Sequence, residues 1–186
     1  MMQPINPLKP VILFADKNKI IEQQVKKNNE IVYGARALNA NVGNFNSRPT
    51  DDYDIYSNTP KQSATQLSTQ LNKHVNAKLT YPKQSEYHKT TFKVMNIGPD
   101  NKPKTKDDYG MVDYTKLERN IKTIQKNGIR YAHYLETKKD KLKSLSDKEY
   151  SFRHKKDGYD LKTIQIHEKK QKSFLKIKNM FKKRLL

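Results

Sequence analysis

Short apolar runs separated by amphipathic segments limit the folds open to this chain more than any other feature of its sequence. Strand composition predicts strands over residues 30–33, 53–56, 77–81, 90–97 and 109–115. Helical periodicity predicts helices over residues 17–28, 35–40 and 60–74. From residue 117 onward the pattern is mostly helical, with predicted breaks at Asn127-Gly128 and at Lys156-Asp157-Gly158. This order of elements predicts an α+β protein with an α/β core and a helical C-terminal part.

Positive charge is concentrated in the second half of the chain. The 186 residues include 38 Lys and Arg against 19 Asp and Glu, a net charge of +19. Residues 1–115 carry 16 basic and 11 acidic side chains, whereas residues 116–186 carry 22 and 8, a local charge of +14. Such clustering indicates a polyanionic partner, and RNA or DNA is the partner that we expect. A solubilising surface is the alternative interpretation.

Composition excludes several classes of protein. The sequence contains no cysteine, which excludes a disulfide framework, thiolate metal sites and a cysteine nucleophile. No run approaches the ~18 apolar residues of a membrane-spanning helix, and the first residues lack a secretory signal pattern. We therefore expect a cytoplasmic protein. The Lys- and Asn-rich composition is also compatible with a protein encoded by a large DNA virus and packaged in its particle.

The sequence predicts four segments. They are an N-terminal arm (1–14), a core (15–115), a helical C-terminal part (116–168) and a basic amphipathic tail (169–186). Four apolar residues of the tail lie at helical spacing, with lysines on the opposite face. These apolar residues are Phe174, Ile177, Phe181 and Leu185. Three interpretations of this tail remain open: docking on the core or on a partner protein, nucleic-acid binding, and a membrane-surface helix.

Two aspartates at the start of one predicted strand carry the clearest chemical signal. Asp52 and Asp54 are two residues apart, so strand geometry puts both carboxylates on one face, roughly 6–7 Å apart. Two like charges this close disfavour joint ionisation unless a cation lies between them. Mg²⁺ prefers one or two carboxylates together with waters and substrate phosphates. Upstream, Gly34 opens a predicted helix and would let the backbone approach a phosphate. An acidic loop without a metal is the alternative interpretation.

A third carboxylate is needed for a site with two metal ions. Asp113 is the best candidate, because it lies between apolar neighbours on the predicted strand 109–115. The strong turn signal at residues 98–101 predicts that this strand pairs antiparallel with the strand 90–97.

These residues together resemble the nucleotidyltransferase superfamily of polymerase-beta-like enzymes. Gly34, Ala37 and Leu38 match its glycine turn, and Arg48, Thr50, Asp52 and Asp54 match its catalytic strand. The similarity is closest to the branch of abortive-infection toxins. The helical half of that branch has motifs that resemble Lys141-Leu142 and the segment 153–161. The resemblance covers about residues 15–168 and implies a mixed sheet with flanking helices.

The resemblance implies an enzyme that moves an NMP from an NTP to a hydroxyl acceptor with Mg²⁺ or Mn²⁺. Asp52, Asp54 and Asp113 would be catalytic and metal-binding. The implied nucleotide contacts are Gly34, Ala35, Arg36, Arg48, Lys141 and Arg153. The basic half of the chain favours RNA or another nucleic acid as the acceptor.

The sequence also departs from the family pattern after the glycine. Ala35 stands where the family has glycine or serine, so no hydroxyl is available to a phosphate, and Arg36 follows it. The alternative function is therefore a catalytically inactive protein of the same fold. Such a protein would use its basic surface to bind nucleic acid or to build an assembly such as a virus particle.

Overall fold

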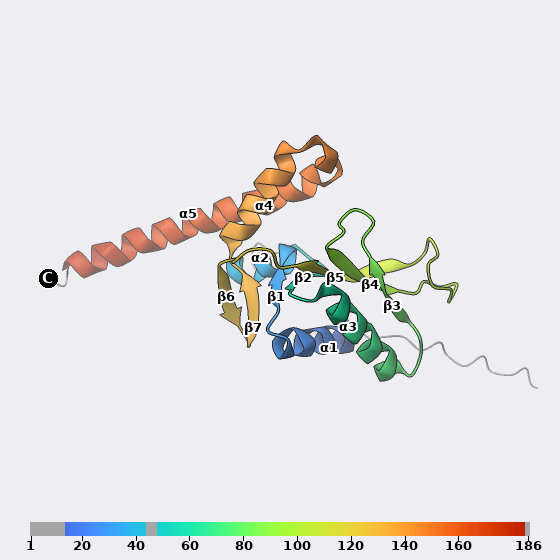
Figure 1. The fold of residues 1–186 in the computed structure, drawn as a ribbon. Helices are drawn as coiled ribbons and strands as arrows, with labels where there is room; N and C mark the ends of the chain where they lie inside the picture. The colour runs from blue at the N-terminus through green and yellow to red at the C-terminus, as the bar shows by residue number, and fades with distance from the viewer. Residues whose placement is uncertain (1–13, 44–47, 185–186) are drawn as a thin grey trace, which may run out of the picture. The chain divides into compact units, whose positions relative to one another are not determined.

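The computed structural model describes residues 14–43 and 48–184 (Figure 1). Most of the predicted N-terminal arm, residues 1–13, lies outside the described residues, as does Leu185 of the predicted tail. The chain divides into two compact units. Unit 1 comprises residues 14–31 and 51–118, and unit 2 comprises residues 32–43, 48–50 and 119–184.

The boundary between the units falls within the short strand β1 (Ile31–Tyr33). The elements of unit 1 are α1 (Phe14–Lys27), β2 (Tyr53–Ser57), α3 (Pro60–Val75), β3 (Thr80–Gln84), β4 (Thr91–Asn96) and β5 (Tyr109–Lys116). The elements of unit 2 are α2 (Gly34–Val42), β6 (Thr123–Lys126), β7 (Ile129–Ala132), α4 (Tyr134–Ser146), the 3₁₀ helix η2 (Lys148–Arg153) and α5 (His154–Arg184). Over the described residues the strands form a seven-stranded sheet in the order β3-β4-β5-β2-β1-β7-β6.

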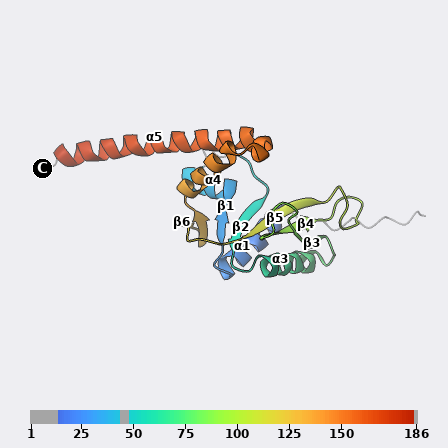
Figure 2. The ribbon, with the colours of Figure 1, turned by 45° about the horizontal axis from the view of Figure 1, so that its top comes forward.

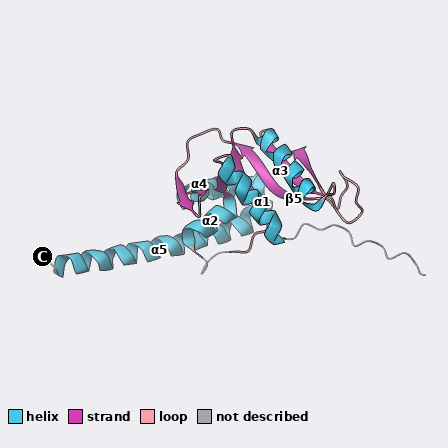
Figure 3. Cartoon of the chain, turned by 90° about the horizontal axis from the view of Figure 1, so that it is seen from below, coloured by secondary structure: helices cyan, strands magenta, loops and turns pink. Residues whose placement is uncertain are grey.

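In unit 1, helices cover one face of the strands. β2 pairs in parallel with β5, whereas β4 pairs antiparallel with both β3 and β5, so the sheet is mixed. Buried Tyr53, Ile55 and Ser57 alternate along β2 with half-buried side chains. The Ser57 hydroxyl lies 2.9 Å from the hydroxyl of Ser63 in α3, so this face of the sheet meets α3. Figure 3 shows α1 beside α3 against the strands.

The antiparallel pairing of the strands 90–97 and 109–115 is confirmed. The strand expected at 77–81 instead begins at Thr80, because Asn76 ends α3 in the left-handed conformation (φ 50°). The side-chain oxygen of Asn72 accepts hydrogen bonds from the backbone N–H groups of Leu79 and Thr80 and fixes the turn. Pro82 is tolerated because β3 is an edge strand.

Unit 2 contains a β-hairpin, β6 and β7, in a region that the sequence predicts to be mostly helical. β6 and β7 pair antiparallel around Asn127 and Gly128, whose φ angles are 52° and 76°. Positive φ at two successive residues is the geometry of a type I′ turn, for which Asn-Gly is the preferred pair. The prediction that the chain is mostly helical from residue 117 is therefore wrong up to Ala132.

The predicted break at Lys156-Asp157-Gly158 is also wrong, because α5 runs through it. Asp157, Leu161 and Ile164 are buried and lie at helical spacing, so packing holds this part of the helix. Gly158 is exposed and has no neighbour near its Cα hydrogens, so it brings only the usual penalty of about 1 kcal/mol for glycine in a helix.

Helix α5 continues well beyond α4, beside which its first part lies (Figures 1 and 2). Every side chain from Lys169 to Lys178 is exposed. Phe174, Ile177 and Met180 are 74%, 52% and 61% exposed. No helix of residues 14–43 and 48–184 is both long enough and apolar enough to cross a membrane.

Candidate active site

Two aspartates lie at paired positions on the neighbouring strands β2 and β5. Asp54 is the Cα partner of Asp113 in the parallel ladder, and both side chains are half-buried. At the next position Ile55 pairs with Tyr114, and both of those side chains are fully buried. Because side chains alternate between the faces of a sheet, the two aspartates lie on the face away from α3. Adjacent strands are about 4.8 Å apart, so the two carboxylates project from neighbouring positions.

A lysine on the next strand completes this row. Lys93 of β4 is the Cα partner of Asp113, and its Nζ donates a hydrogen bond to Oδ2 of Asp113 at 2.7 Å. The two side chains are 33% and 29% exposed. The ammonium group therefore neutralises part of the negative charge of the aspartate pair. The sequence alone does not indicate Lys93, because a long loop joins β4 to β5 and leaves the register of the two strands undefined.

Asp52 is exposed and lies just before β2. In the part of the chain that the structure describes, no three side chains of the His, Cys, Asp or Glu type are grouped so as to hold a metal ion. The observed constellation is thus the pair of Asp54 and Asp113 with Lys93 beside it. Carboxylate oxygens are the ligands that Mg²⁺ and Mn²⁺ prefer, so the donor chemistry of the pair fits a divalent ion. The metal-binding roles of all three aspartates stay predictions.

The glycine turn has the expected local conformation. Gly34 is the first residue of α2 and has a φ of 67°, a value that side chains with a Cβ rarely adopt. Ala35 is buried and Arg36 is half-buried. The first turn of α2 contains no acidic residue, and Tyr33 provides no side-chain cap. No carboxylate of this first turn itself therefore offsets the positive end of the helix dipole.

Three of the predicted nucleotide contacts meet in a buried ion cluster of unit 2. The Nζ atom of Lys141 lies 2.6 Å from Oδ1 of Asp157 and 3.1 Å from Oδ2 of Asp160. Arg48 donates from Nε to Oδ1 of Asp160 at 3.0 Å. Arg153 lies farther away, with its Nε 3.9 Å from Oδ2 of Asp157. The cluster thus ties the segment around residue 48 to α4 and α5.

The three central charges of this cluster, those of Lys141, Asp157 and Asp160, compensate one another away from water. Lys141, Asp157 and Asp160 are 6%, 0% and 1% exposed. Burial alone would raise the pKa of Asp157, but the hydrogen bonds from Lys141 and Ser144 and the positive charges of Lys141 and Arg153 together outweigh it, so the pKa lies below its ordinary value. The ammonium group of Lys141 is therefore engaged by two carboxylates. Its contact with a phosphate stays a prediction, as do those of Arg48 and Arg153.

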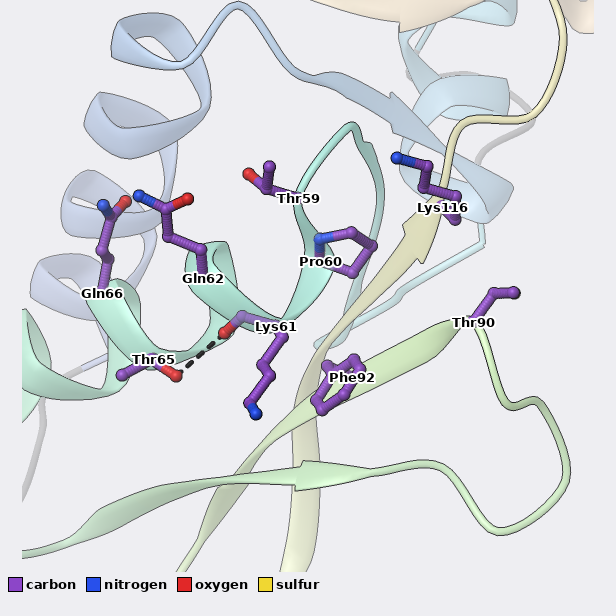
Figure 4. A pocket seen from close by; sticks show the side chains of 9 residues that line it. All are labelled: Thr59, Pro60, Lys61, Gln62, Thr65, Gln66, Thr90, Phe92 and Lys116. Carbon is purple, nitrogen blue, oxygen red and sulfur yellow. Dashed lines mark hydrogen bonds between the residues drawn. The ribbon is translucent and has the colours of Figure 1, made fainter.

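A hollow of about 600 Å³ lies beside the first turns of α3 (Figure 4). Thr59, Lys61 and Gln62 line it from α3 and the residue before the helix, and Phe92 and Lys116 line it from β4 and β5. Phe92 is the Cα partner of Tyr114 and so belongs to the face that meets α3. The hollow and the aspartate pair therefore lie on opposite faces of the sheet, and the hollow is not the site of the carboxylates.

Comparison with solved structures identifies the fold. The crystal structure of the Megavirus polyadenylate synthase is similar over 87% of this chain, with a TM-score of 0.64 and 18% sequence identity. The chain has a nucleotidyltransferase-like fold. The expected mixed sheet with flanking helices is confirmed, and the chain ends in a long helix.

A second similar structure is JHP933 from Helicobacter pylori, which aligns over 80% of this chain with a TM-score of 0.51 and 16% identity. The chain spans 33% of the length of the Megavirus protein and 62% of JHP933. No protein-family model matches the sequence, and no curated protein matches it. The likeness to these structures therefore concerns the fold.

Proposed function

We propose that this chain is a metal-dependent nucleotidyltransferase that moves an NMP from an NTP to a hydroxyl acceptor, RNA or another nucleic acid. The observation that carries the proposal is the pairing of Asp54 with Asp113 in the parallel ladder. Their carboxylates project from neighbouring positions on the face away from α3, in a chain with a nucleotidyltransferase-like fold. Two carboxylates with waters and substrate phosphates make a suitable set of ligands for Mg²⁺ or Mn²⁺.

Each group has a defined role in the proposed reaction. Asp54 and Asp113, with Asp52 beside them, would hold the divalent ions. Bound metal would neutralise phosphate charge and polarise the acceptor hydroxyl. The sequence resemblance implies that the turn at Gly34 to Arg36 contacts the triphosphate, and backbone N–H groups at the start of a helix suit a phosphate. Lys93 would give up Asp113 and turn to a phosphate oxygen, to which an ammonium group binds as a point charge.

Charge supports a nucleic acid as the acceptor. Residues 116–186 carry a net charge of +14, and the similar Megavirus protein is a polyadenylate synthase. A polyanionic acceptor is drawn to such a surface, whereas a small neutral acceptor is not. Membership of the branch of abortive-infection toxins and packaging in a virus particle are finer proposals that rest on the sequence resemblance and composition.

A second candidate function is a catalytically inactive protein of the same fold that binds nucleic acid. The specific observation in its favour is the ion pair of Lys93 with Asp113 at 2.7 Å. A lysine that stayed there would substitute for a metal ion at the carboxylate. Ala35, where the resembled family has glycine or serine, points the same way.

Label transfer separates the two candidates. Purified protein is incubated with each α-labelled NTP, Mg²⁺ or Mn²⁺, and pooled RNA or the protein itself as acceptor. We expect transfer by the wild type and none by Asp54→Asn/Asp113→Asn. Asp51→Asn is the matched control, because Asp51 precedes β2 and lies outside the pair. Absence of transfer with every NTP, together with salt-sensitive RNA binding, would support the inactive protein instead.

A further inference from the structure

An open hollow of about 840 Å³ lies between α4 and the middle of α5, within unit 2. We call it the α4–α5 groove and define it by the side chains that the argument uses: Tyr134 and Lys138 from α4, and His167, Lys170, Lys172 and Phe174 from α5. None of these residues has a role in the proposed nucleotide transfer. The groove therefore needs an explanation of its own.

The groove presents aromatic rings on a fixed support. Tyr134 packs against the buried cluster of Leu38, Leu161 and Ile164, which holds its ring in place. The His167 ring meets the Tyr134 ring edge-on, with centroids 5.2 Å apart and an interplanar angle of 75°. Phe174 lies two turns farther along α5 and is 74% exposed. Leu175, which also lines the groove, is 62% exposed, so Phe174 belongs to a shared apolar surface, and contiguous exposed apolar surface marks interaction sites.

Positive charge lies beside these rings. Lys138 is paired with Glu168, with Nζ 2.9 Å from Oε1, so these two charges cancel. The net positive charge of the groove therefore rests on Lys170 and Lys172, which are both exposed. Cations beside exposed aromatic faces form the combination that binds phosphates and stacks bases at the same time.

We propose that the α4–α5 groove binds a segment of single-stranded nucleic acid, with a base stacked on Phe174 and phosphates on Lys170 and Lys172. A second copy of the chain fits less well, because residues 169–184 contain eight basic residues and no acidic one, and two copies would bring like charges together. A duplex hides its base faces, so it would leave the aromatic rings unused. The binding goes beyond the proposed transfer reaction and does not need it.

Fluorescence anisotropy with the full chain tests this proposal. The probes are a labelled 12-nucleotide RNA, the DNA of the same sequence, the corresponding duplexes and anionic lipid vesicles. We expect Phe174→Ala to weaken single-strand binding about tenfold, since stacking on one aromatic ring contributes about 1–3 kcal/mol. Phe152→Ala, which removes an 81% exposed ring outside the groove, is the matched control and should leave the affinity unchanged.

Salt dependence provides a second readout. Lys170→Gln/Lys172→Gln should reduce the slope of log affinity against log salt by about 1.4, because each lost phosphate contact removes about 0.7 for a single strand. Lys176→Gln/Lys178→Gln removes the same charge from the same helix outside the groove and should change the slope less. Single-strand binding should persist in Asp54→Asn/Asp113→Asn, which keeps this test separate from catalysis.

Three results would overturn the proposal. If the two double lysine variants changed the salt slope equally and Phe174→Ala did not change the affinity, the overall charge of the helix would bind nucleic acid without a defined site. Duplexes that bind as tightly as single strands would exclude stacking. Vesicle binding without nucleic-acid binding would assign the exposed part of α5 to a membrane surface. A difference between RNA and DNA in the first assay would identify which single strand the groove prefers.

Discussion

Removal of Lys141 should destabilise the protein strongly. Lys141→Met keeps most of the aliphatic stem but leaves Asp157 and Asp160, 0% and 1% exposed, without their shared ammonium group. Breaking a buried ion pair from one side costs about 3–5 kcal/mol, because the remaining charge stays desolvated. Arg48 still contacts Asp160 at 3.0 Å and offsets part of this loss. We therefore expect a decrease of about 3 kcal/mol in the free energy of unfolding.

The assay is urea denaturation followed by far-UV circular dichroism, with Lys138→Met as the matched control. Lys138 lies one turn earlier on α4 and also pairs with an acidic residue of α5, Glu168, but those side chains are 32% and 25% exposed. A partly exposed pair contributes about 0–1 kcal/mol, so this variant should lose at most that amount. Equal losses in the two variants, or a loss under 1 kcal/mol for Lys141→Met, would refute the reasoning from burial.

Three further predictions concern other parts of the molecule. Burial raises the pKa of Glu30 above its ordinary value, against the hydrogen bond from Ser63. The stability that Glu30 contributes is therefore complete below the unfolded-state pKa of about 4.3 and is lost as the pH rises through the folded-state pKa. Glu30→Gln should raise the free energy of unfolding by about 1 kcal/mol at pH 7.5 and change it little at pH 4. Urea titrations at both pH values measure the difference. Equal effects at the two pH values would argue against a raised pKa of Glu30. Lys93→Gln should tighten Mn²⁺ binding about fivefold, because Lys93 competes with the ion for Asp113 and a partly exposed ion pair is worth about 1 kcal/mol. Titration calorimetry measures this affinity, and an unchanged value would mean that the lysine does not compete. Gly34→Ala should lower the free energy of unfolding by about 1–2 kcal/mol, because its φ of 67° is strained for alanine, and thermal unfolding that is indistinguishable from wild type would contradict this.

The sequence predicted the strands of unit 1 that carry Asp54 and Asp113 well because its signals there are local. Strand alternation around Asp54 and the turn after residue 97 were enough to predict β2 and the β4–β5 pair. The sequence correctly predicts a break at Asn127-Gly128, but β6 and β7 on either side have four residues each, too few for periodicity to distinguish a strand from a helix. The helix break predicted at Gly158 is wrong because α5 is stabilised there by tertiary packing. The buried residues on both sides of Gly158 make these contacts, and the local sequence does not reveal them.

The candidate site could be predicted only in part, for reasons of register and pairing. That Asp113 lies on a strand followed from the sequence, but its alignment with Asp54 and Lys93 follows from the parallel and antiparallel ladders. The nucleotide contacts of Lys141 and the segment 153–161 stay predictions, and their joining in an ion cluster depends on the packing of α4 against α5. Composition cannot show which lysines face carboxylates inside the protein and which face solvent.

The most direct test of the central claim is the anomalous scattering of Mn²⁺ in crystals grown with a non-hydrolysable NTP. We expect a manganese peak within about 2.0–2.5 Å of carboxylate oxygens of both Asp54 and Asp113, with the Nζ atom of Lys93 moved away from Asp113. Asp54→Asn/Asp113→Asn crystals grown in the same way should lack the peak. Wild-type crystals with nucleotide bound, no manganese at the pair and Lys93 still on Asp113 would contradict the account and favour an inactive nucleic-acid-binding protein.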